Sequence, residues 1–335
     1  TRVRSSAASD VYKRQLEYSE RGDLILHTTL ILAFCLLGSE GKQEFEVLRT
    51  IDAHNGPVRA LAFSPCGKYF ATGGDDKVIR VWNVETGKEH ARLKGHTDIV
   101  KSLCYYDDGK KLFSGSEDKT IKLWDIATKR ELQTLKGHTD AVECLALDAK
   151  GQLLLSGSSD KTIKVWDAVK LVEKRTLKGH TMNIFSLSVS KENNVVASGS
   201  ADGDVRVWDI GTGKSLFSSY AHDFFVYAVA FESRGKRFVS GGMDGKICVW
   251  DYGKGRMEKC FKVHEREVRG IAVLKDGLIV SGSLDETLKV LRLDAEKGAV
   301  TSQKMDMKIL GLQAFKDLLA VFGYNGKVVI LKRRR

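Results

Sequence analysis

The sequence predicts an all-β fold in which a unit of four short antiparallel strands repeats along the chain and closes into a ring. Six histidines recur at intervals of 42 residues: His54, His96, His138, His180, His222 and His264. Five tryptophans recur at the same interval: Trp82, Trp124, Trp166, Trp208 and Trp250. Between them stand short apolar and β-branched runs separated by Gly, Asp and Lys turns, and no stretch keeps a helical period. A fixed period of this size predicts a stack of similar β-units.

The first unit illustrates the four expected strands. They cover residues 58–64, 69–74, 78–84 and 89–93, with polar turns at 65–68, 75–77 and 85–88. Short runs bounded in this way are typical of β-strands joined by tight turns. Four further full units follow, and a sixth, headed by His264, has Leu291 where a tryptophan is expected.

A seventh unit is expected at the end of the chain, although it has neither the histidine nor the tryptophan. Its strands correspond to residues 307–315, 318–326 and 327–332, so it lacks a fourth. Residues 44–50 align with the last strand of a unit but precede any unit of their own. We therefore expect 44–50 to pair with the last unit and close the ring, because closure removes the unpaired sheet edges.

Residues 1–42 do not share the repeat, and we interpret them as a non-repeat N-terminal extension that is disordered or not native. The first methionine of the sequence is Met182. The apolar run at 24–37 is too short to span a bilayer comfortably, and a signal segment is the open alternative. We expect residues 43–335 to form a single repeat domain.

Charge and cysteine content set broad limits. The formal net charge is +11, with both signs mixed along the repeats and four basic residues at 332–335. We interpret this as a solvated surface with a basic tail, and attraction to nucleic acid or an acidic partner is the alternative. None of the six cysteines is spaced as C-x-x-C, so we expect no metal site and reduced, mostly buried thiols.

Four motifs carry a family resemblance: GHTDIVKSL, GSEDKTIKLWD, GHTDAVECL and GSSDKTIKVWD. Over about residues 43–332 the chain resembles the WD-repeat β-propeller family. The resemblance implies seven four-stranded blades around a channel and a role as a platform for protein complexes. Asn83 in place of aspartate, Leu291, and the seventh unit depart from the family pattern.

The resemblance also implies a structural network in each full unit, joining the histidine, a strand hydroxyl, the turn aspartate and the tryptophan. The expected sets are His54, Thr72, Asp76, Trp82; His96, Ser114, Asp118, Trp124; His138, Ser156, Asp160, Trp166; His180, Ser198, Asp202, Trp208; and His222, Ser240, Asp244, Trp250. Each set has matched donors and acceptors. Because it recurs five times, we interpret it as scaffold and expect no catalytic residue, metal or cofactor.

Function is expected where the units differ, on the face formed by the Gly-His loops and the Asp turns. The residue after the start of each first strand is predicted to lie at the channel rim: Arg59, Lys101, Glu143, Phe185, Tyr227, Arg269 and Leu310. The turns add Asp75, Glu117, Met243, Leu284 and Tyr324, and the loop before the fifth unit adds Phe225, with either Phe224 or Phe225 expected to pack inward. Units one to three are charged or polar here, whereas later units are largely apolar. We hypothesise that this face binds an extended peptide with an apolar anchor and flanking charges.

These observations favour a non-catalytic protein-protein interaction scaffold, a monomeric propeller that binds peptides or partner proteins within a multiprotein complex in the cytoplasm or nucleus. The alternative is an RNA- or ribonucleoprotein-associated propeller that uses its basic surface and its C-terminal Lys/Arg tail. No membrane association is expected.

Overall fold

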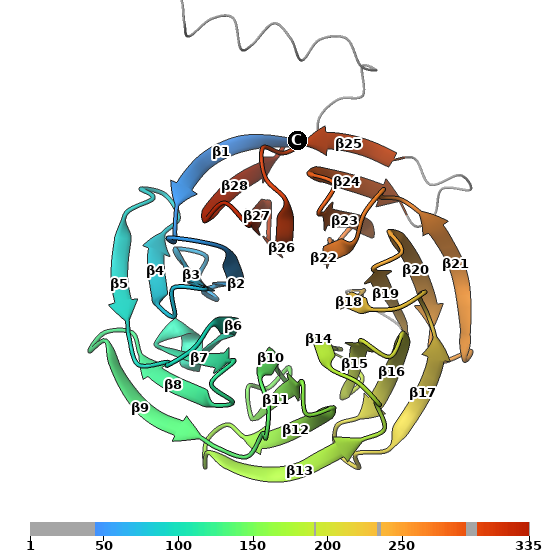
Figure 1. Ribbon diagram of the computed structural model, residues 1–335, viewed down its shortest axis with the longest axis horizontal. Coiled ribbons are helices and arrows are strands. Elements are labelled where there is room, and N and C mark those ends of the chain that lie inside the picture. The colour runs from blue at the N-terminus through green and yellow to red at the C-terminus, as the bar shows by residue number, and fades with distance from the viewer. Residues whose placement is uncertain (1–43, 191, 233–235, 293–299, 335) are drawn as a thin grey trace, which may run out of the picture. The chain divides into compact units, whose positions relative to one another are not determined.

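The computed structural model describes residues 44–334, apart from 191, 233–235 and 293–299. Within the compact unit Gln43–Arg335, seven four-stranded antiparallel sheets are arranged as blades around a central channel (Figure 1). The prediction of a seven-bladed all-β propeller is confirmed. The interpretation of residues 1–42 as an extension lies outside the described residues.

Each blade contributes one strand to each of four concentric positions (Figure 1). The innermost strands are β2 (Val58–Phe63), β6 (Val100–Tyr106), β10 (Val142–Leu147), β14 (Ile184–Val189), β18 (Val226–Phe231), β22 (Val268–Val273) and β26 (Ile309–Phe315). The second strands are β3 (Tyr69–Gly74), β7 (Lys111–Ser116), β11 (Leu153–Ser158), β15 (Val195–Ser200), β19 (Arg237–Gly242), β23 (Leu278–Ser283) and β27 (Leu318–Gly323).

The third strands are β4 (Ile79–Asn83), β8 (Ile121–Asp125), β12 (Thr162–Asp167), β16 (Asp204–Asp209), β20 (Lys246–Asp251), β24 (Thr287–Arg292) and β28 (Lys327–Arg333). The outermost strands are β1 (Phe45–Asp52), β5 (Glu89–Leu93), β9 (Arg130–Leu135), β13 (Val172–Lys178), β17 (Ser215–Tyr220), β21 (Arg256–Lys262) and β25 (Val300–Lys304). A 3-10 turn, η1 (Asp107–Gly109), joins β6 to β7. The described residues contain no helix with the length and hydrophobicity of a membrane span.

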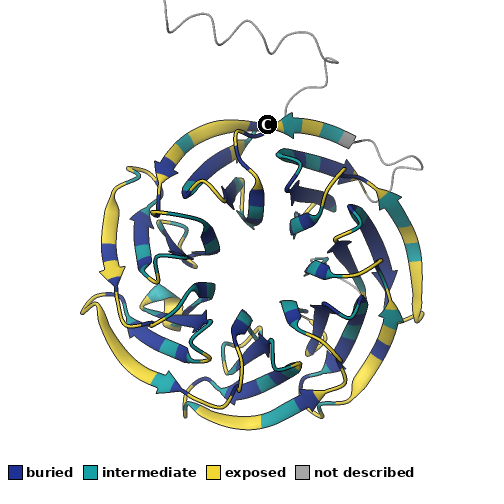
Figure 2. Ribbon diagram, viewed as in Figure 1, coloured by how far each residue is buried: buried dark blue, intermediate teal, exposed yellow. Residues whose placement is uncertain are grey.

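Burial falls from the second strand to the outermost strand of a blade, as Figure 2 shows. In the first blade, β3 is buried at all but its first residue, whereas three of the five residues of β5 are exposed. The apolar core lies between neighbouring blades. One cluster joins Ala71 and Val81 of the first blade to Leu103, Leu112 and Trp124 of the second. Each blade therefore stabilises the next through sheet-on-sheet packing.

A glycine in the second strand allows this close approach. A Cβ atom on Gly73 would lie 2.5 Å from Val100 Cγ1 of the next blade, and one on Gly115 would lie 2.6 Å from Val142 Cγ1. These distances are too short for any side chain, so the glycine of each Gly-Ser or Gly-Gly pair is a packing requirement between blades.

The two ends of the described chain meet in one blade. β1 pairs antiparallel with β28, from Phe45 opposite Arg333 to Asp52 opposite Lys327. β1 therefore supplies the outermost strand of the blade whose other strands are β26, β27 and β28. It extends two residues beyond the range 44–50 expected from the sequence, and Ile51 packs into the core between this blade and the first.

The cysteines differ in part from the expectation. Cys248 in β20 and Cys260 in β21 stand directly opposite each other and form a disulfide, so the prediction that all cysteines are reduced is wrong for this pair. Antiparallel pairing brings opposite side chains close enough for this bond, which spacing along the sequence does not reveal. Cys104 and Cys144 are free, and burial raises the pKa of Cys104 to about 12. Cys66 is free but exposed.

Candidate functional site

The repeated His, Ser, Asp and Trp residues form one hydrogen-bonded network in each full blade. In the third blade, His138 Nδ1 lies 2.7 Å from Asp160 Oδ2, and His138 Nε2 lies 2.7 Å from Ser156 Oγ. Trp166 Nε1 donates to the same Ser156 Oγ at 2.9 Å. The other four expected sets, headed by His54, His96, His180 and His222, make the corresponding contacts.

The sixth blade keeps part of this arrangement. His264 is fully buried and bonds to Ser281 and Asp285, while the buried Leu291 replaces the tryptophan.

The networks explain the ionisation of the turn aspartates. Burial raises the pKa of Asp244, but hydrogen bonds from His222 and from backbone N–H groups outweigh it and hold that pKa at about 2. The pKa values of Asp118, Asp160 and Asp202 are likewise well below the usual range, against the effect of burial. Each of these aspartates is therefore hydrogen-bonded to other groups of its own network.

A β-bulge in every innermost strand positions the channel rim. In each blade the pairing of the first two strands shifts by one residue, for example between Val58 and Ala60 and between Val226 and Ala228. The residues left out of the ladder are the seven predicted rim residues: Arg59, Lys101, Glu143, Phe185, Tyr227, Arg269 and Leu310. Bulges re-aim side chains, which accounts for their position.

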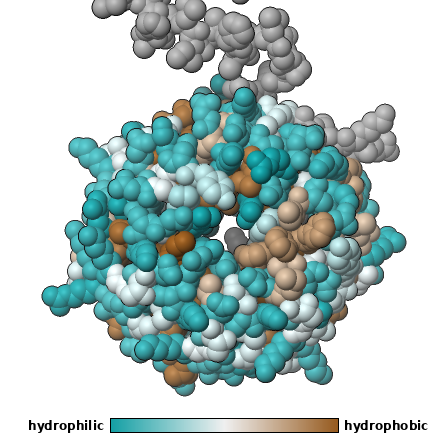
Figure 3. All heavy atoms as spheres, in the orientation of Figure 1, coloured by the Kyte–Doolittle hydropathy of each residue, from teal (hydrophilic) through white to brown (hydrophobic). Residues whose placement is uncertain are grey.

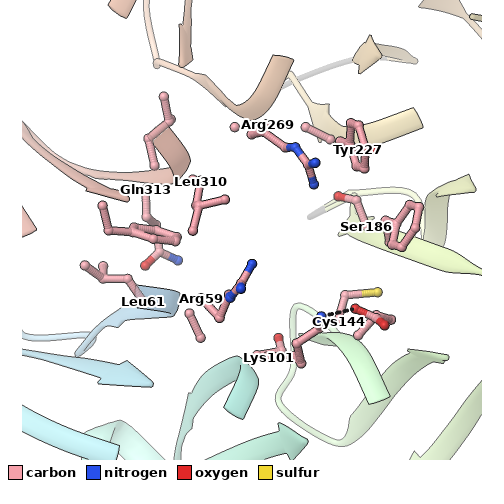
Figure 4. Close-up of a pocket in the computed structure, with 18 of the residues that line it drawn as sticks. Arg59, Leu61, Lys101, Cys144, Ser186, Tyr227, Arg269, Leu310 and Gln313 are labelled. Atoms are coloured by element: carbon pink, nitrogen blue, oxygen red, sulfur yellow. Dashed lines mark ion pairs between the residues drawn. The ribbon is translucent and has the colours of Figure 1, made fainter. Parts of the chain in front are cut away.

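All seven rim residues line one cavity of about 320 Å³ at the channel (Figure 4). None of the turn residues proposed with them lines this cavity. The turns are held beside the rim by backbone hydrogen bonds to the Gly-His loops, such as Asp75 N–H to the Pro57 carbonyl and Met243 N–H to the Phe225 carbonyl.

The charged part of the rim is internally paired. Arg59 Nε donates to Asp75 Oδ1 at 2.6 Å, so the first blade neutralises its own charges. Lys101 Nζ lies 3.0 Å from Glu117 Oε1 and 3.3 Å from Glu143 Oε2, which joins the second and third blades.

The aromatic rim residues Phe185 and Tyr227 form a triad with the loop residue Phe225. Ring centroids are 5.9 Å apart for Phe185 and Phe225, 5.3 Å for Phe185 and Tyr227, and 5.7 Å for Phe225 and Tyr227. Arg269 Cζ lies 3.6 Å from the Tyr227 ring centroid. Such packing fixes the aromatic rings beside the cavity.

The turn and loop residues differ in exposure. Met243 is 42% exposed and Tyr324 is 41% exposed, and the Tyr324 ring lies 5.5 Å from Arg59 Cζ. Leu284 is only 6% exposed, so it presents far less side-chain area at this face than Met243 or Tyr324.

Phe224 is the aromatic of its loop that faces outward. It is 69% exposed and adopts φ +78°, a left-handed conformation costly for a bulky residue, whereas Phe225 is half-buried. Figure 3 shows apolar side chains beside the channel mouth on the side of the ring where β18 lies.

Sequence reasoning missed Met182, which is 45% exposed and follows His180 by two residues, as Phe224 follows His222. That shared loop position was the signal that could have identified it.

Comparisons with known families agree with this architecture. The family described as "WD domain, G-beta repeat" matches residues 45–83, 87–125 and 129–167. The family described as "Vps42 beta-propeller" matches residues 167–291. Together these matches cover the first blades and most of the later ones.

Curated relatives are similar over short stretches. "Target of rapamycin complex subunit LST8-1" of Arabidopsis thaliana is 41% identical over 61 residues, 18% of this chain and 20% of that protein. "Ribosome biogenesis protein ERB1" of Yarrowia lipolytica is 49% identical over 45 residues, 13% of this chain and 6% of that protein. "U3 small nucleolar RNA-associated protein 15" of Schizosaccharomyces pombe is 42% identical over 53 residues, 16% of this chain and 11% of that protein. The matched segments thus span a fifth or less of these relatives. The repeat matches and the seven four-stranded blades identify the chain as a seven-bladed β-propeller that contains WD repeats.

Proposed function

We propose that this chain is a non-catalytic scaffold that binds an extended segment of a partner protein across the channel mouth. The observation that carries the proposal is the aromatic triad of Phe185, Phe225 and Tyr227, half-buried beside a cavity to which every blade contributes one rim residue and its strand neighbours. Aromatic residues in such a position are typical binding hot spots. The name of the relative LST8-1, a complex subunit, supports a similar role.

The neighbouring exposed side chains extend this surface. Phe224 and Met243 add exposed apolar area beside the triad, and the strained backbone of Phe224 holds its ring in solvent. Strain of this kind is concentrated at functional sites, where an interaction offsets its cost. The histidine and aspartate pairs are structural in this proposal, because each histidine is bonded on both ring nitrogens and is nearly inaccessible.

The nucleic-acid alternative has weaker support. Lys332 and Arg333 belong to β28 rather than to a free tail. Arg333 pairs with Asp276 at 2.8 Å and with Glu44 at 3.6 Å, and Arg334 lies 3.8 Å from Glu46. Basic groups already paired with carboxylates are poor candidates for phosphate contacts, so we favour a protein partner.

The proposal is tested by affinity purification and quantitative mass spectrometry with wild-type protein and a Phe185→Ala/Tyr227→Ala variant. We expect the variant to recover its main partners roughly tenfold less, because removing hot-spot aromatic side chains costs more than 1 kcal/mol each. Leu132→Ala/Val172→Ala, which removes exposed apolar side chains from the outer strands β9 and β13, is the matched control and should recover all partners.

Nuclease treatment separates the two functions. Partners retained after nuclease support protein binding, whereas partners lost with it support the ribonucleoprotein alternative. If a folded Phe185→Ala/Tyr227→Ala variant recovers every partner at the wild-type level, the proposed binding face is wrong.

A further inference from the structure

Arg269 is the cation of the channel rim that lacks an acidic partner among the residues that the structure describes. Its Nε is buried and makes no hydrogen bond there, and its guanidinium stacks on Tyr227 with Cζ 3.6 Å from the ring centroid. The nearby Glu267 carboxylate lies beside Arg266 instead, at 3.6 Å. Figure 4 shows the Arg269 guanidinium directed into the cavity. A buried guanidinium N–H without an acceptor costs stability unless a ligand supplies one.

The other rim cations are already neutralised. Arg59 is paired with Asp75, and Lys101 lies between Glu117 and Glu143. Each of these contacts joins a rim cation to a carboxylate within 3.3 Å. Within the described chain, a ligand that enters the cavity therefore meets one cation without a carboxylate partner on the side of the aromatic triad, and one excess negative charge around Lys101.

We propose that the peptide bound at this face carries an aspartate or glutamate whose carboxylate pairs with Arg269, next to an apolar residue that packs on Phe185 and Tyr227. This inference rests on the proposed function and specifies the chemistry of the partner. Two carboxylate oxygens match the planar fork of the guanidinium, and stacking on Tyr227 holds that fork in place.

A carboxylate fits the site better than a phosphate group. A phosphorylated side chain carries a charge of about −1.5 to −2 and is typically bound by several basic groups. Arg269 is a single available cation, because Arg59 and Lys101 are occupied by their own carboxylates. One negative charge therefore pairs with Arg269, and a second would add to the excess negative charge around Lys101.

The geometry also sets the spacing of the two anchors. The Phe185 and Tyr227 centroids are 5.3 Å apart, and Arg269 Cζ lies 3.6 Å from the Tyr227 centroid. In an extended peptide, side chains two residues apart point to the same face and are separated by about 7 Å. The apolar residue and the acidic residue should therefore stand two positions apart.

The test uses a random 12-residue peptide library displayed on phage and panned against the full chain. Enriched peptides are synthesised in pairs, with the acidic residue kept or replaced by its amide, and their Kd values are measured by fluorescence anisotropy. We expect replacement of the acidic residue to weaken binding to the wild-type protein about tenfold or more, since charged hydrogen bonds are the strong ones. The same replacement should change binding to Arg269→Gln less than twofold.

Two further variants sharpen the result. Arg269→Lys keeps the charge but not the fork, and should bind the acidic peptide with intermediate affinity. Arg130→Gln removes an exposed arginine of the outer strand β9, which is outside the cavity lining, and should bind like the wild type. The peptide pair tests the wild-type protein itself, so the result stands even if an Arg269 variant folds poorly.

The outcomes separate this inference from the function on which it rests. Peptides that require Phe185 but tolerate both the amide replacement and Arg269→Gln would overturn the carboxylate assignment and leave the proposed function standing. Enriched peptides with a basic residue at the anchor would also overturn it. Failure of the wild-type protein to enrich any peptide over Phe185→Ala would overturn both proposals.

Discussion

Removal of one hydroxyl group should destabilise a whole blade. Ser156 is fully buried, and its Oγ accepts a hydrogen bond from Trp166 Nε1 at 2.9 Å and lies 2.7 Å from His138 Nε2. In Ser156→Ala the indole N–H and the imidazole nitrogen both lose their partner, while the side-chain volume hardly changes. Each buried polar group left without a partner costs about 1–3 kcal/mol, so we expect the free energy of unfolding to fall by about 2–6 kcal/mol.

The chain supplies two matched controls for this prediction. Thr72 holds the same position in the first blade and makes the same two contacts, at 2.8 Å each, so Ser156→Thr should lose much less stability than Ser156→Ala. Ser218 is exposed in the outer strand β17, and Ser218→Ala should remain within about 0.5 kcal/mol of the wild type.

Urea denaturation followed by tryptophan fluorescence measures the effect as a shift of the unfolding midpoint at constant m value. A midpoint for Ser156→Ala equal to that of Ser218→Ala would refute the reasoning. It would mean that water or a neighbouring group replaces the hydroxyl, so that the network contributes little to stability.

Three further predictions follow from the geometry. Acid should destabilise the protein, because the pKa of Asp244 is about 2 in the folded chain and 3.8 in the unfolded chain, so about 2 kcal/mol of stability that is present above about pH 4 is lost as the pH falls towards 2. Burial lowers the pKa of His264 below 6.5, which adds a loss of stability in the same direction. Urea unfolding midpoints that rise on acidification would contradict both expectations. Ile51→Ala should lower the free energy of unfolding by about 2–4 kcal/mol because it removes core contacts at the ring closure, whereas the exposed Leu48→Ala on the same strand should have little effect in the same assay. Alkylation of the denatured, unreduced protein should leave Cys248 and its partner unmodified, and their labelling without reductant would argue against the disulfide.

The repeat could be predicted because it depends on local spacing. A hydrogen-bonded set such as His138, Ser156, Asp160 and Trp166 requires fixed residue types at fixed separations, and these separations are visible in the sequence. The rim position could also be predicted, since it always follows the apolar residue that begins the innermost strand. Its physical cause, the β-bulge, is a property of strand pairing and appears only in the structure.

The properties that could not be predicted depend on contacts between blades and loops. Leu284 and Met243 both precede the turn aspartate of their units, yet one is buried and the other exposed. The pairing of Lys101 with Glu143 joins two blades, so no pattern within a unit reveals it. The disulfide depends on register between neighbouring strands, and the outward position of Phe224 depends on a left-handed backbone conformation.

The bulge offers a physical reason why this scaffold can acquire a specific partner without losing its fold. A bulged residue is outside the strand ladder and half exposed, as Phe185, Tyr227 and Arg269 are, so its identity contributes little to blade stability. The histidine, hydroxyl and tryptophan residues of each network are buried and hydrogen-bonded, so their identity is restricted. Sevenfold repetition alone would present the same chemistry around the channel and would not orient an asymmetric peptide. Variation at the bulges breaks this equivalence, with paired charges on one side and aromatic rings beside Arg269 on the other. Specificity can therefore change at seven positions while stability is maintained elsewhere, which is why the binding variants are expected to fold normally and the network variants are not.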